Sequence, residues 1–94
     1  MVGEAVSEPD ATIAALRARI SANDRELVER LNDRLRLVAE MKAYKQSQGI
    51  AFLDPERERE MLEDLRRANT GPLSGEGLEA LFAAVLALTK DELA

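Results

Sequence analysis

Residues 10–48, DATIAALRARISANDRELVERLNDRLRLVAEMKAYKQSQ, form a run of 39 residues without glycine or proline. Apolar side chains recur along this run in steps of mostly three and four, the spacing of one face of an α-helix. This apolar seam consists of Ile13, Leu16, Ile20, Leu27, Leu31, Leu35, Val38 and Met41. Asp10-Ala11-Thr12 offers an N-cap, and Gly49 can adopt the positive φ typical of a helix C-terminus. The pattern predicts one helix over 10–48.

Two shorter helices are predicted downstream, each after a break in the sequence. Asp54 followed by Pro55 is an N-cap with proline at the first helical position, which predicts a helix over 55–70. The Gly71-Pro72-Leu73-Ser74 segment then separates it from a third helix over 74–93. Because alanine, leucine, arginine and glutamate dominate and β-branched residues are sparse, the predicted fold class is all-α.

The length of the first helix indicates a dimer. At about 1.5 Å per residue it is roughly 55–60 Å long, whereas a compact monomer of this size is only about 30–35 Å across. A helix with an apolar seam along its whole length needs a partner, and a second copy of the chain is the most economical one. We therefore expect an obligate homodimer of one helical domain, 10–94, preceded by a disordered tail, 1–9.

The composition narrows the possible functions. Of the 94 residues 33% are charged and 46% apolar, as in soluble globular proteins, and no apolar run is long enough to span a membrane. The absence of cysteine and histidine excludes disulfides, Ser-His-Asp triads and the usual zinc sites. We expect a cytoplasmic protein without a metal. The net charge of −5 argues against nucleic-acid binding, but residues 17–45 carry eight basic and five acidic side chains. This local excess of positive charge suits a small anion.

Several charged residues occupy positions where the helical pattern calls for apolar side chains. Arg34 and Lys45 lie on the continuation of the seam, about three turns apart, and Arg17 lies on a neighbouring line. In the second helix the apolar line leads back to Glu58, with Arg57 beside it. Buried cations need compensation, and a guanidinium fits a carboxylate bidentately. The three arginines and the lysine therefore favour a small dicarboxylate ligand, although each residue alone could be a solvated or register-setting charge.

In these residues the sequence resembles the all-helical chorismate mutases, over about residues 13–93. The resemblance rests on the order and spacing of several short sequence segments taken together. They are Leu16-Arg17-Ala18-Arg19-Ile20-Ser21-Ala22-Asn23-Asp24, then Arg34 and Lys45, then Asp54-Pro55-Glu56-Arg57-Glu58. Residues 69–73 and the Leu81-Phe82 pair look like the subgroup that is fused to, or associated with, the first synthase of the shikimate pathway.

The resemblance implies an intertwined homodimer with two identical sites, each built by the long helices of both chains. The implied reaction is the rearrangement of chorismate to prephenate, towards phenylalanine and tyrosine. Arg17 from one chain, with Arg34 and Arg57 from the other, would hold the two carboxylates of chorismate. Lys45 would donate to the ether oxygen of the breaking bond. Such a rearrangement requires no nucleophile, metal or cofactor, only positioning and a fixed positive charge where negative charge develops.

The remaining site residues include one departure from the family pattern. Asp54 and Glu58 would meet the ring hydroxyl, and Thr89 stands where the family often has a serine. Leu93 stands where the family usually has a glutamine, or in some members a glutamate, as a second donor to the ether oxygen. Because leucine has no donor, the resemblance implies a weaker catalyst, one that a partner ordering this helix end could assist.

Two alternatives stay open at this stage. A related helical fold can act as an isochorismate pyruvate lyase or rearrange aminochorismate, although Glu58 favours the mutase because it would accept from a hydroxyl group. Alternatively, the chain is a non-catalytic regulatory helical dimer, a module that controls a shikimate-pathway synthase.

Overall fold

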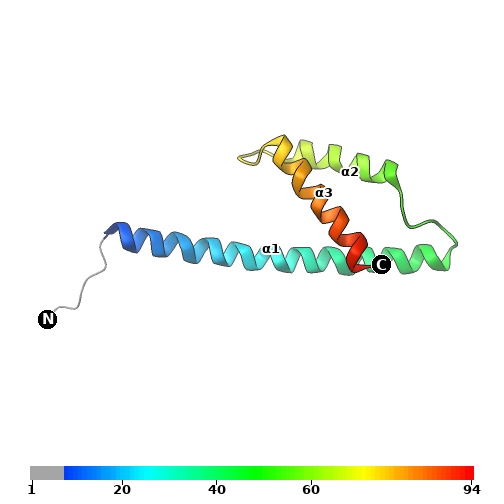
Figure 1. Cartoon of the computed structure of the whole chain (residues 1–94), viewed down its shortest axis with the longest axis horizontal. Helices are drawn as coiled ribbons and strands as arrows, with labels where there is room; N and C mark the ends of the chain where they lie inside the picture. The colour runs from blue at the N-terminus through cyan, green and yellow to red at the C-terminus, as the bar shows by residue number, and fades with distance from the viewer. Residues whose placement is uncertain (1–7) are drawn as a thin grey trace. The chain divides into compact units, whose positions relative to one another are not determined.

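Three α-helices make up the described structure: α1 spans Glu8–Ser47, α2 spans Pro55–Ala68 and α3 spans Gly75–Glu92 (Figure 1). The computed structural model describes residues 8–94, and no β-strand occurs among them. The predicted all-α class, with one very long and two shorter helices, is therefore confirmed.

α1 begins two residues before the predicted start at Asp10. Glu8 and Asp10 lie in its first turn, where carboxylates interact favourably with the positive end of the helix dipole. Pro9 also fits there, because the first N–H groups of a helix have no partner within the helix. The predicted disordered tail falls mostly on residues 1–7, which lie outside the described residues.

The end of α1 is fixed by the glycine that the sequence pattern singled out. Gly49 has a φ of 68°, and its N–H donates to the carbonyl of Gln46 at 3.3 Å. The N–H of Ile50 donates to the carbonyl of Lys45 at 2.8 Å. These two bonds form a Schellman motif, which satisfies carbonyls that a helix end otherwise leaves without partners. Lys45 is thereby part of the structure that ends the helix.

α2 and α3 pack against each other and meet at a corner formed by residues 69–74 (Figure 1). The Asn69 side chain closes this corner: its amide nitrogen donates to the Leu73 carbonyl at 2.9 Å, and its oxygen accepts from the Gly71 N–H at 3.0 Å. The hydroxyl of Ser74 caps α3 by accepting from the Gly77 N–H at 3.0 Å. The break predicted between the second and third helices is therefore a well-bonded turn.

The chain divides into two compact units, one ending at Arg34 and the other beginning at Leu35, within α1. Among the described residues, Leu78 and Thr89 alone are buried, and both belong to α3. Large apolar side chains of both units are exposed instead. Those of the first unit are Ile13, Leu16, Ile20, Leu27 and Val28. Those of the second are Leu37, Met41, Tyr44, Ile50, Leu53, Leu73 and Leu81. No helix in residues 8–94 has the length and apolarity to cross a membrane.

Candidate active site

The loop after α1 forms hydrogen bonds with both the backbone and the side chain of Lys45. Its backbone carbonyl accepts the N–H of Ile50, and its side-chain Nζ donates to the carbonyl oxygen of Phe52 at 3.3 Å. The residue is half-buried. The lysine predicted to act on the substrate is thus presented from the last turn of α1, with its ammonium group beside the loop that leads to α2.

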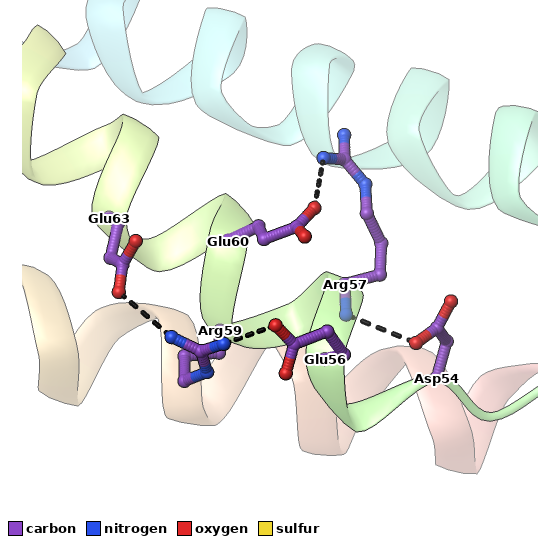
Figure 2. Close-up of polar contacts among 6 residues, drawn as sticks. All are labelled: Asp54, Glu56, Arg57, Arg59, Glu60 and Glu63. Carbon is purple, nitrogen blue, oxygen red and sulfur yellow. Dashed lines mark hydrogen bonds and ion pairs between the residues drawn. The ribbon is translucent and has the colours of Figure 1, made fainter.

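Asp54 and Arg57 form the start of α2 (Figure 2). The carboxylate of Asp54 caps the helix by accepting the backbone N–H of Arg57 at 3.1 Å, as the Asp-Pro pair predicts. The Arg57 guanidinium is 71% exposed and lies 3.7 Å from Glu60, at the long end of the range for an ion pair. Such an exposed contact is weak, so the guanidinium is available to a carboxylate ligand.

Arg59 behaves differently from Arg57, although only two positions separate them. It forms ion pairs with Glu56 and, at 3.2 Å, with Glu63. Figure 2 shows these pairs on a different side of α2 from Arg57, as two helical steps of about 100° require. Of the two arginines, Arg57 therefore has the guanidinium with fewer ion-pair partners, and its role in the site stays a prediction.

Glu58 connects the start of α2 to the end of α3. Its carboxylate is half-buried and lies 3.2 Å from the Nζ of Lys90. Next to Lys90, Thr89 is only 4% exposed, and its hydroxyl donates to the carbonyl of Val85 at 2.7 Å. The structure therefore brings Glu58 to the part of α3 that carries Thr89, two residues that the sequence analysis placed in one site.

Leu93 is the C-cap of α3. Its N–H donates to the carbonyl of Thr89 at 3.0 Å, and its side chain is half-buried. Its own carbonyl accepts a hydrogen bond from the Nζ of Lys42. Carbonyls at a helix C-terminus have no partner within the helix and carry the negative end of the dipole, so an ammonium group is a favourable partner there.

Arg17 and Arg34 belong to the first unit, and both lie on α1. Within residues 8–94, the Arg17 side chain is exposed and makes no hydrogen bond or ion pair. Arg34 is half-buried and takes part in a polar interaction. The predicted residues of the second unit are Lys45, Asp54, Arg57, Glu58, Thr89 and Leu93.

The chain matches the model of the family "chorismate mutase type II" over residues 16–92. It belongs to this family. The matched range contains every predicted site residue except Leu93, which lies one position beyond it. The predicted departure from the family pattern thus falls at the edge of the shared region.

Two solved structures of chorismate mutase from Thermus thermophilus are similar to the chain. Its form II has 35% sequence identity and a TM-score of 0.81, with 85% of this chain and 91% of that chain covered. Its form I also has 35% identity, with a TM-score of 0.80 and coverage of 83% and 98%.

A bifunctional chorismate mutase/prephenate dehydratase from Pseudomonas aeruginosa is 35% identical over 79 residues. The match takes in 79% of this chain but 22% of that relative, so the chain spans about a fifth of its length. The mutase of this relative is joined to a dehydratase, and the predicted likeness to the synthase-associated subgroup stays a prediction.

Lys42 and Lys90 are polar residues near the candidate site that the sequence analysis did not assign to it. Lys42 bonds to Leu93, 51 positions away, and Lys90 pairs with Glu58 on another helix. The sequence held one signal for Lys42, namely its position three residues before Lys45, which places both lysines on one face of the helix. It held no signal for the pairing of Lys90.

Proposed function

We propose that this chain rearranges chorismate to prephenate. The observation that carries the proposal is the family match over 16–92, because it includes seven of the eight residues assigned to the site from the sequence. The similarity to the Thermus thermophilus chorismate mutases, which extends over most of both chains, supports it. The reaction breaks the ether C–O bond and forms a C–C bond within one molecule, so substrate and product have the same atoms.

The site residues are proposed to act by positioning and by charge. Arg17, Arg34 and Arg57 would bind the two carboxylates of chorismate and hold its side chain folded over the ring, which removes much of the entropic barrier. The exposed Arg57 guanidinium, with only a long contact to Glu60, supports this role.

The other residues are proposed to act at the ether oxygen and the ring. The Lys45 ammonium would donate to the ether oxygen, where negative charge develops in the transition state. Asp54 and Glu58 would accept hydrogen bonds from the ring hydroxyl, and Thr89 would line the same site. The contact of the Glu58 carboxylate with Lys90 Nζ, at 3.2 Å, supports its placement at the part of α3 that carries Thr89.

We further propose that the active form is an intertwined homodimer. The apolar side chains exposed along α1, with Leu27 62% exposed, and the lack of any buried residue on this helix support the proposal. Burying such a face is worth about 25 cal/mol per Å² of apolar surface, and a second α1 would offer a matching apolar face. Each site would then take Arg17 from one chain and its remaining residues from the other.

Two further proposals concern a partner protein and the location of this protein in the cell. Association with the first synthase of the shikimate pathway is supported by residues 69–73 and Leu81-Phe82, of which Leu73 and Leu81 are exposed. A cytoplasmic location is the proposal that fits the cysteine-free sequence.

Incubation with chorismate tests the proposed function. We expect the purified protein to consume chorismate, followed by its absorbance, and to form an equal amount of prephenate, which acid converts to phenylpyruvate. Release of pyruvate instead would indicate a lyase. No consumption by a folded protein would contradict the proposal and favour the regulatory module.

A further inference from the structure

Lys42 lies one turn before Lys45 on α1 and contacts two separate parts of the second unit. Its Nζ donates to the carbonyl of Leu93 at the end of α3, and the same atom lies 5.4 Å from the centroid of the Phe52 ring. The residue is half-buried. One ammonium group thus joins α1, the end of α3 and the loop between α1 and α2.

Phe52 contacts both lysines. Its ring faces the Lys42 ammonium in cation–π geometry, and its carbonyl accepts from the Lys45 ammonium at 3.3 Å. Phe52 lies in the stretch between Gly49 and Asp54, outside any helix, so helical hydrogen bonds do not fix its position. Phe52 thus links the two ammonium groups, with its ring at Lys42 and its carbonyl at Lys45.

We propose that Lys42 is a positioning residue for Lys45, acting through Phe52 and anchored by the carbonyl of Leu93. The inference rests on the proposed function, in which Lys45 must direct its ammonium at the ether oxygen. The anchor is strong because a charge-assisted bond meets the negative end of the α3 dipole. A displacement of about 1 Å in a catalytic group is enough to lower the rate by about 100-fold, so loss of the anchor acts on the chemical step.

Lys42→Met tests the inference, because methionine keeps the length and apolar character of the side chain but removes its charge and its donor. We expect kcat to fall about 10- to 100-fold, with KM changed by less than about twofold because no carboxylate contact is lost. Lys42→Arg should restore most of kcat. Arg67→Met, which removes an exposed cation 3.8 Å from Asp64 at the end of α2, is the matched control and should leave kcat unchanged.

Hydrogen exchange supplies a readout that needs no substrate. In Lys42→Met the amides of Leu93 and of residues 50–53 should exchange about tenfold faster, because the end of α3 and the loop lose their shared anchor. The Arg67→Met control should leave these amides unchanged. If the wild type does not convert chorismate, the proposed function fails, while exchange still decides whether Lys42 anchors these segments.

Two results would overturn the inference. A rise in KM without a fall in kcat, together with unchanged exchange, would make Lys42 a group that binds substrate directly. If Lys42→Met does not fold, Phe52→Leu tests the inference in its place, because this variant loses the ring but keeps the bond from Lys42 to Leu93. We expect a several-fold lower kcat from Phe52→Leu, and an unchanged kcat would exclude the coupling.

Discussion

Replacing Lys45 with methionine is expected to lower kcat about 100- to 1,000-fold, the effect of removing one donor that stabilises developing negative charge. The ammonium is the positive group proposed to face the ether oxygen, and methionine retains the aliphatic part of the side chain. Because the substrate carboxylates are assigned to arginines, KM should change much less than kcat. Steady-state kinetics with chorismate measure both constants.

The fold should tolerate this substitution. Lys45 is half-buried and its ammonium bonds only to the Phe52 carbonyl among the contacts described, so removing the charge leaves no buried ion without a partner. Far-ultraviolet circular dichroism should show unchanged helicity. Gln46→Met, an exposed position in the same turn, is the control and should retain full activity. A folded Lys45→Met variant with more than a tenth of wild-type kcat would refute the assigned role.

Leu93→Gln is expected to raise kcat/KM, by up to about 100-fold, because it supplies a second donor to the ether oxygen. The backbone at this position is already fixed by the bond from Leu93 N–H to Thr89 and by the bond from Lys42 to the Leu93 carbonyl. Neither bond involves the leucine side chain, so the substitution preserves both. The kinetics of chorismate consumption measure the change.

Leu93→Met is the matched control for this gain, because methionine has a similar volume and no donor. It should behave like the wild type. Equal rates for Leu93→Gln, Leu93→Met and the wild type would mean that the side chain at the end of α3 does not reach the substrate. The assignment of residue 93 to the site, which extends one position beyond the family match, would then be wrong.

Sequence patterns predicted the helices well because local signals set their ends. Gly49 adopts the positive φ that ends α1, and Asp54 caps α2 as its pairing with Pro55 predicts. The start of α1 was misplaced by two residues because Glu8 and Pro9 are compatible with a first helical turn as well as with a tail. Such a boundary depends on small differences in local free energy that a pattern does not resolve.

The contacts between elements could not be predicted in the same way. Helical periodicity relates residues three or four positions apart, whereas Lys42 meets Leu93 and Glu58 meets Lys90 only because the helices fold back on each other. A lysine in a helix is also ordinarily a surface residue, so its position in the sequence does not indicate such a contact. These contacts between distant parts of the chain therefore became visible only in the structure.

Two chains are proposed to build each chorismate site together, and mixing two inactive variants tests this central claim most directly. In Arg17→Ala and Lys45→Ala homodimers both sites lack one essential group. A heterodimer of the two has one site with both defects and one site that is complete, because Arg17 and Lys45 come from different chains. With random exchange, half of the dimers are heterodimers, so an equimolar mixture should recover about a quarter of wild-type activity. A mixture that exchanges subunits and gains no activity over the separate variants, while the wild type is active, would contradict the shared site.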